Sequence, residues 1–469
     1  MTLIIVAILL MAYLLIGTEH LTNVSKAAVA IFAGTVGWVL YICYGMDFVM
    51  GVHPKEYADF LGNAAPTSLG VKQYIAQNIF LKHVGRASEI VIFLLATMTI
   101  VEILSNNGCF DFIRQLLKTR SSQRMLWTLS GITFLLSANL DNLSTTVMML
   151  AVMRTLIQSR RQRILFGSAI VIAANCGGAL TVIGDPAGLV LWNMEEVTAT
   201  AFSMRMLLPC LVAWIGPTWW IGRQLPERCD LGWSAMPFRG DDTRLTVWQR
   251  LLMLFVGIGG LWFIPTFHNI TQLSPFLGAL CVLAVLWIVD EIYNRNLAAS
   301  GELARRKVPT ALQYETIQMV LYVMGLMLAV GVVEETGAIQ WLVTQIADSG
   351  LDAGCWLTGI SASLLSTVLD NFATAITFFS LNPSAEVNSI CWSVVAFASA
   401  NYLKVSVSSS PSKCFFIGQP QPLRLHHLFD EVASATVSTD IVADINARLF
   451  HLRTGIRRTA RAPYPTQHL

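Results

Sequence analysis

Two short segments with the same acidic and amide residues are the part of this sequence best suited to chemistry. Residues 135–145 read Leu-Leu-Ser-Ala-Asn-Leu-Asp-Asn-Leu-Ser-Thr, and residues 364–374, displaced by 229 positions, read Leu-Leu-Ser-Thr-Val-Leu-Asp-Asn-Phe-Ala-Thr. Each places an Asp-Asn pair and hydroxyls inside apolar sequence, where a carboxylate at the centre of a bilayer costs about 2.5 to 3.5 kcal/mol. Because Asp141 and Asp370 incur this cost at matching positions, we predict that both belong to a binding site.

The same offset relates residues well outside these two segments. It pairs Met98 with Met327, Val101 with Val330, Gly108 with Gly337 and Trp127 with Trp356, without a gap. The pattern indicates an internal duplication, and each Asp-Asn segment is one copy of the same structural unit.

The composition is that of a membrane protein. The chain has 469 residues, of which 54% are hydrophobic and 13% charged, and its mean hydropathy is +0.59. The chain is more hydrophobic and less charged than an average soluble protein, which indicates a polytopic membrane protein. The net charge is only +2, and the Lys and Arg residues form no basic patch, so nucleic acid is not an expected partner. The nine cysteines have no Cys-x-x-Cys spacing, which argues against a zinc site or a disulfide framework.

Long apolar runs divide the chain into two repeats. The runs are long enough, or nearly so, to cross the bilayer and lie at 2–17, 27–46, 88–105, 164–192, 203–222, 249–266, 276–293, 314–333 and 387–403. We predict a first transmembrane repeat at 1–222, a cytoplasmic linker at 223–248, a second repeat at 249–403 and a polar, basic tail at 404–469. Residues 47–87 mix Gly, Pro and charge, so we predict an extramembrane or interfacial connection there.

The charges around each Asp-Asn segment predict a re-entrant hairpin. Seven basic residues flank the first segment on both sides (Lys118, Arg120, Arg124, Arg154, Arg160, Arg161 and Arg163), which fits a segment that enters and leaves the cytoplasmic face. The second segment is flanked by Asp348, Asp352 and Glu386 and is expected to enter from outside. Such hairpins need protein or water around their tips, so the Asp-Asn pairs should lie near the midplane. Oppositely oriented copies form the inverted repeat typical of secondary transporters.

A glycine-rich stretch after the first hairpin predicts a broken helix. Residues 173–188 carry Asn175, Gly177 and a Gly-Asp-Pro sequence around Asp185 inside an otherwise helical span. An unwound segment there frees carbonyl oxygens for a cation or helix N-termini for an anion. With Asp141, Asn142 and Thr145, Asp185 makes an oxygen-rich set suited to a small cation or to protons.

The expected substrate or ion site therefore draws on both repeats. Its members are Asp141, Asn142, Thr145, Asn175, Gly177, Asp185, Ser366, Asp370, Asn371 and Thr374, with Asp141, Asp185 and Asp370 as the carboxylates that bind a small transported cation or protons. Asn and Thr side chains also tie membrane helices together without any ligand, and a Gly-Gly pair can simply let two backbones approach. Taken singly, the Asn and Thr residues of the two tips fit either role.

The residues resemble a known family at this point. The Leu-Asp-Asn-Leu-Ser-Thr tip at 140–145, Ala-Ala-Asn-Cys-Gly-Gly at 173–178, Ile-Gly-Asp at 183–185 and the opening region 13–28 resemble the ion transporter superfamily, within it the NhaD-type sodium/proton antiporters and their arsenite- and citrate-permease relatives. The resemblance covers most of residues 1–400. It implies that the hairpin tips and broken helices hold the substrate and coupling ion at Asp141, Asn142, Asn175, Asp185, Asp370 and Asn371, and that transport proceeds by alternating access.

The chain also departs from that pattern. Pro186 follows the Ile-Gly-Asp where the antiporters have threonines, and Phe372-Ala373-Thr374 follows the second Asp-Asn where they have a proline. The expected glycine-rich broken helix of the second repeat is absent from residues 398–411, which leaves that repeat incomplete. Either the tail has diverged, or a coding-frame change near residue 398 has replaced it.

We therefore expect an all-α polytopic membrane protein with two inverted repeats, each with a re-entrant hairpin and a broken helix. Its expected function is sodium/proton antiport in the inner membrane, with carboxylates that bind either protons or a cation. A cation-coupled citrate or dicarboxylate permease and a non-transporting membrane scaffold are the alternatives. No phosphate loop, His-Glu-x-x-His or nucleophile elbow points to an enzyme, and no cofactor is expected. The expected partners are the bilayer, a small ion or organic anion and, from the resemblance, a second copy in a homodimer.

Overall fold

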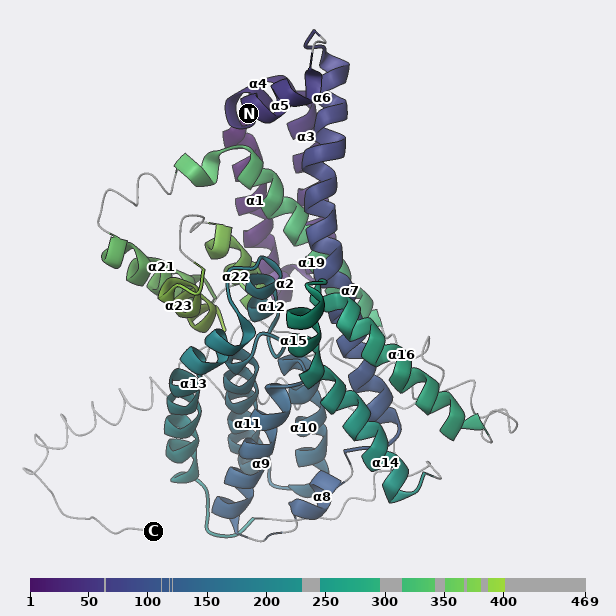
Figure 1. Ribbon diagram of the computed structural model, residues 1–469. Helices are drawn as coiled ribbons and strands as arrows, with labels where there is room; N and C mark the ends of the chain where they lie inside the picture. The colour runs from purple at the N-terminus through teal and green to yellow at the C-terminus, as the bar shows by residue number, and fades with distance from the viewer. Residues whose placement is uncertain are drawn as a thin grey trace, which may run out of the picture.

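The described part of the chain is helical and contains no β-strand. A computed structural model describes residues 1–62, 65–110, 112–117, 119, 121–229, 245–295, 314–341, 351–366, 369–380 and 387–400 (Figure 1). Every one of the nine apolar runs expected from the sequence contains a helix. The tail at 404–469, with its suspected frame change, and residues 230–244 of the expected linker lie outside the described residues.

In chain order, the described helices are α1 (Thr2–Gly17), α2 (Glu19–Thr22), α3 (Lys26–Cys43), α4 (Gly45–Val52), α5 (Pro54–Leu61), α6 (Ser68–Tyr74), the π-helical turn η1 (Ile75–Phe80), α7 (Leu81–Asn106), α8 (Phe112–Leu116), α9 (Ser122–Ser137), α10 (Asn142–Leu156), α11 (Arg160–Leu180), α12 (Pro186–Asn193), α13 (Ala199–Gly222), α14 (Val247–Leu254), the π-helical turn η2 (Phe255–Gly259), α15 (Gly260–Thr271), α16 (Pro275–Tyr293), α19 (Tyr314–Glu335), α21 (Leu351–Ser366), α22 (Asn371–Ser380) and α23 (Ile390–Ser399). The predicted boundaries at 222 and 249 lie beside the end of α13 and the start of α14, and the division into two repeats stays a prediction.

Seven helical stretches of the described chain are long and apolar enough to cross a membrane. They are Lys26–Cys43, Ser68–Asn106, Arg160–Leu180, Ala199–Gly222, Val247–Thr271, Pro275–Tyr293 and Thr316–Glu335. Three of them, at α13, at α14 to α15 and at α16, bury little of their apolar surface inside the protein, which fits helices that face lipid. The expectation of an all-α, multi-pass membrane protein is confirmed.

Residues 47–87, expected to be an extramembrane or interfacial connection, are largely helical. Ser68–Asn106 forms one continuous helical stretch of 39 residues. The charged Lys72, Lys82 and Arg86 all lie on its exposed face, and its buried face carries Val71, Ile75, Ile79 and similar residues at helical spacing. The stretch is therefore an amphipathic helix. Its charged residues suggest a connection, whereas the three-to-four-residue spacing of its apolar residues indicates a helix.

Each Asp-Asn segment is the tip of a pair of short helices. α9 and α10 meet at Asp141, and α21 and α22 meet at Asp370. In Figure 1, α9 and α10 run side by side from the lower end of the molecule and their tip lies at mid-height, close to α12 and α22. Ser137 at the end of α9 donates to the Ala174 carbonyl of α11 at 2.6 Å, and its counterpart Ser366 donates to the Ala398 carbonyl of α23 at 3.4 Å. The two copies are thus fastened to their neighbouring helices in the same way.

The predicted broken helix is present, and its break is narrower than the glycine-rich sequence suggested. α11 continues through Asn175 and Gly177 and ends at Leu180, so the irregular segment is limited to 181–185. The Thr181 hydroxyl donates to the Ala138 carbonyl at 2.6 Å, which fastens the break to the first tip. Pro186 then starts α12, where its missing N–H costs no helical hydrogen bond.

Helices α3 and α19 cross closely and bring the two halves of the sequence together. A methyl group added at Gly325 would lie 2.5 Å from the backbone nitrogen of Ile31, and one added at Gly34 would lie 2.9 Å from the Gly325 carbonyl oxygen. These glycines allow the backbones to approach as small residues do in membrane helix pairs. The Trp38 indole on α3 also donates to the Leu328 carbonyl of α19 at 3.0 Å.

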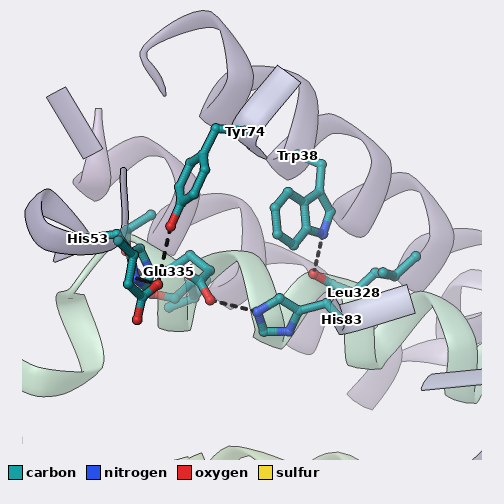
Figure 2. A network of polar contacts seen from close by, with 9 residues as sticks. Trp38, His53, Tyr74, His83, Leu328 and Glu335 are labelled. Atoms are coloured by element: carbon teal, nitrogen blue, oxygen red, sulfur yellow. Dashed lines mark hydrogen bonds and ion pairs between the residues drawn. The ribbon is translucent and has the colours of Figure 1, made fainter. Parts of the chain in front are cut away.

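A carboxylate held between two histidines adds further contacts between α19 and the N-terminal segments (Figure 2). The Glu335 carboxylate at the end of α19 lies 2.7 Å from His83 Nε2 on α7 and 2.7 Å from His53 Nε2 before α5. The other ring nitrogen of His53 lies 3.1 Å from Glu56, which also accepts from the Tyr74 hydroxyl at 3.2 Å. Three N-terminal segments are thereby tied to one helix of the second half.

Candidate functional site

Asp141 and Asp370 occupy the same structural position in their two hairpins. Each is the residue before a short helix, and each uses Oδ1 to accept a backbone N–H of the first turn, from Ser144 at 2.7 Å and from Ala373 at 2.9 Å. This is N-capping, which satisfies a donor that the helix itself cannot. The positive end of each helix dipole favours a carboxylate there. Local chemistry therefore fixes where both carboxylates lie.

A third carboxylate joins the two tips. Asp185 caps α12 with Oδ1, which accepts the backbone N–H of Ala187 at 2.9 Å, while Oδ2 accepts from the side-chain amide of Asn142 at 3.0 Å and from that of Asn371 at 3.3 Å. Its side chain is 2% exposed. The Asn of each tip thus binds the same buried carboxylate, and the expected convergence of the tips on the broken helix is what the structure shows.

Three buried oxygen atoms at the tips have no hydrogen-bond partner among the described residues. They are Oδ2 of Asp141 and the hydroxyl oxygens of Thr145 and Thr374. The two threonines hold equivalent positions in the duplication, and Asp141 is 6% exposed. Leaving a buried polar atom without a partner costs about 1–3 kcal/mol, and more for a charged group. Oxygens of this kind suit a hard cation or a hydrogen-bonding substrate.

The second tip differs from the first because its carboxylate has partners on both oxygens. Lys26 at the start of α3 places Nζ 3.0 Å from Asp370 Oδ2, and the Tyr322 hydroxyl of α19 donates to Oδ1 at 2.8 Å. Neither residue was among the expected site residues, since they lie 344 and 48 positions from Asp370. Lys26 directly precedes the apolar run at 27–46, and a charged residue at that position could have indicated a functional side chain.

The other predicted residues lie around these tips in more ordinary settings. Gly177 lies where α11 meets α9, and a methyl group there would lie 2.2 Å from the Phe134 carbonyl oxygen. Asn175 is a partly buried residue of α11. Ser366 is buried and donates to carbonyl oxygens of α21 and α23. A small hollow beside the break is lined by Ala179, Thr181, Asp185, Ala187, Gly188, Phe202, Ala396 and Ala400.

The three carboxylates do not form one metal cage. Within the described ranges, no group of three or more His, Cys, Asp and Glu side chains is spaced to hold a metal ion. Asp185 accepts three N–H donors, and Asp370 contacts an ammonium and a phenol. Among the described residues, Asp141 is the carboxylate of the tips with an oxygen that has no hydrogen-bond partner.

Comparison with known sequences agrees with this architecture. The profile of the family described as "Citrate transporter" matches residues 1–401. The chain belongs to this citrate transporter family. It is thus a multi-pass protein of a transporter family and not an enzyme. The match covers both tips, the broken helix and α3, so the polar centre described above lies wholly within the family's region.

Several curated proteins are similar to the chain. It is 30% identical to "Sodium/proton antiporter 1" of Arabidopsis thaliana over 71% of this chain and 57% of that protein. It is 28% identical to "Sodium/proton antiporter 2" of the same plant over 71% of this chain and 78% of the relative. It is 24% identical to "Na(+)/H(+) antiporter NhaD" of Alkalimonas amylolytica over 64% and 56%, respectively. The alignment thus spans little more than half of the first and third of these proteins.

Proposed function

We propose that this protein is a sodium/proton antiporter that works by alternating access. The observation that carries the proposal is Asp141, a buried carboxylate at a helix N-terminus whose Oδ2 has no described protein partner. The names of the similar proteins from Arabidopsis and Alkalimonas supply the substrate class. Burial in a low-dielectric setting disfavours an uncompensated charge, so this carboxylate must take up either a proton or a cation.

Competition between a proton and a cation for the same carboxylate is sufficient for exchange. A cation that binds to Asp141 displaces a proton, and a proton that binds displaces the cation, so the loaded site carries one or the other across. Asn142 and Asn371 hold Asp185 beside the tips, and the hydroxyls of Thr145 and Thr374 offer neutral oxygens. The two hairpins and the broken helix then move relative to the lipid-facing helices, exposing the site to one side of the membrane at a time.

The test is a pH-gradient dequenching assay in everted membrane vesicles, with NaCl, LiCl, KCl or citrate added in turn. We expect Na⁺ or Li⁺ to dissipate the gradient in the wild type, and we expect Asp141→Asn to abolish the response. Asp59→Asn, on the exposed face of α5, is the matched control and should behave as wild type. Retention of Na⁺ exchange by Asp141→Asn would contradict the proposed site.

A carboxylate permease is the second candidate, and the family description favours it. The N-termini of α10, α12 and α22 converge at the tips and could receive an anion. Against it, Lys26 is the cation found at the tips of the described structure, and it is already paired with Asp370. Citrate-dependent uptake without any response to Na⁺ or Li⁺ would favour this candidate. The transporter family argues against a non-transporting scaffold.

We propose the inner membrane as the location of the protein, and the bacterial origin of the relatives named NhaD supports this proposal. The homodimer implied by the family resemblance and the absence of a cofactor stay predictions.

A further inference from the structure

An ion pair distinguishes the second tip from the first. Lys26 reaches Asp370 Oδ2 at 3.0 Å, and the two side chains are 28% and 27% exposed. The ammonium also lies 4.4 Å from the centre of the Tyr322 ring, whose hydroxyl donates to Asp370 Oδ1. Two contacts therefore hold a positive charge against this carboxylate, the ion pair and the cation–π contact, and the tyrosine of the second contact also hydrogen-bonds the carboxylate.

The position of the lysine is fixed by the fold around it. Lys26 is the first residue of α3, and its backbone N–H donates to the Glu19 carboxylate at 3.4 Å. Tyr322 belongs to α19, which crosses α3 at Gly34 and Gly325 so closely that neither glycine has room for a side chain. The charge is thus presented to the tip by a closely packed pair of helices from distant parts of the sequence.

The equivalent carboxylate of the first tip has no such partner. Asp141 makes no ion pair among the described residues, and its Oδ2 is without a hydrogen bond. The duplication has therefore become chemically asymmetric, with an open carboxylate in one copy and a neutralised carboxylate in the other.

We propose that Lys26 is the resident cation of the second tip and a positioning residue for transport. It neutralises Asp370 throughout the cycle, so that the transported cation binds at Asp141 alone. The inference rests on the proposed function, and it assigns Asp370 a structural charge pair in place of the ligand role expected from the sequence.

The pair predicts a specific pattern of single and double variants. Lys26→Met leaves Asp370 uncompensated, and Asp370→Asn leaves the ammonium uncompensated. Because an uncompensated charge in this partly buried setting is more harmful than the removal of both charges, each single variant should lose about tenfold or more of the Na⁺-dependent rate, whereas Lys26→Met with Asp370→Asn should regain most of it. Lys26→Arg keeps the charge and should stay active.

The experiment is the vesicle assay with the initial rate measured over a range of Na⁺ concentrations and normalised to protein in the membrane. We expect the double variant to keep the wild-type half-saturating Na⁺ concentration, which a ligand of the transported ion would not. With wild type active and Asp141→Asn inactive, the proposed function stands. A double variant as inactive as the single ones, although present in the membrane and monodisperse in detergent, would then overturn the role of Lys26. A wild type silent to every cation would instead overturn the proposed function, and the inference with it.

Discussion

Replacing either asparagine that binds Asp185 should lower the free energy of unfolding, and the loss should be larger for Asn142 than for Asn371. Asn142→Ala removes a 3.0 Å hydrogen bond to a carboxylate that is 2% exposed. Hydrogen bonds to charged groups contribute about 1.5–3 kcal/mol, so we expect a loss in that range. Asn371→Ala removes a longer bond of 3.3 Å, and the same amide is shared with the Ala400 carbonyl at 3.5 Å. Its loss should lie at the lower end of the range.

The two substitutions should also depend on each other. Both amides bind Oδ2 of the same carboxylate, and residues of one hydrogen-bond network rarely have additive effects. The double variant should therefore differ from the sum of the single ones by about 0.5 kcal/mol or more.

Thermal unfolding in detergent measures these differences, at roughly 2–4 °C for each kcal/mol in a large chain. Asn269→Ala, at an exposed position of α15, is the matched control and should leave the transition unchanged. If Asn142→Ala lowers the transition while Asn371→Ala matches the control, the second tip does not bind Asp185 and the shared centre is wrong.

Two further predictions concern packing and the histidine clamp. Gly177→Ala should lower folded yield and stability by about 1–3 kcal/mol, because its methyl group would lie 2.2 Å from the Phe134 carbonyl oxygen; Gly51→Ala, which meets nothing within 4 Å, is the control, and equal melting temperatures would contradict the packing role. Glu335→Gln should destabilise by about 1–3 kcal/mol, since it weakens the contacts to His53 and His83, both at 2.7 Å. An unchanged unfolding transition in detergent would show that the clamp contributes little.

The tips could be predicted from short sequence segments. A carboxylate beside an amide inside apolar sequence costs free energy in a bilayer and therefore indicates a function, and Asp370 repeats the pattern of Asp141. The break of the helix before Asp185 was predictable for the same reason, since glycines and a proline punctuate it. Its precise limits were not, because Gly177 turned out to serve helix packing rather than unwinding.

The partners of the tips could not be predicted from local sequence. Lys26 meets Asp370 only because α3 crosses α19, and that crossing depends on glycines far from either residue. The meeting of Asn142 and Asn371 at one carboxylate likewise depends on how two hairpins pack. In residues 47–87, the mixture of Gly, Pro and charge hides the periodic apolar face of 68–87, which the spacing of Val71, Ile75 and Ile79 indicates.

The single carboxylate bound by both asparagines also has an evolutionary consequence. An ancestral dimer of identical halves would have needed two copies of every polar group, whereas here one Asp185 accepts an amide from each tip. Neither part of the chain alone contains all the donors of Asp185, because α22 supplies an amide to an acceptor that lies before α12 in the sequence. If the two parts were encoded by separate genes, they would have to associate before this carboxylate was fully hydrogen-bonded.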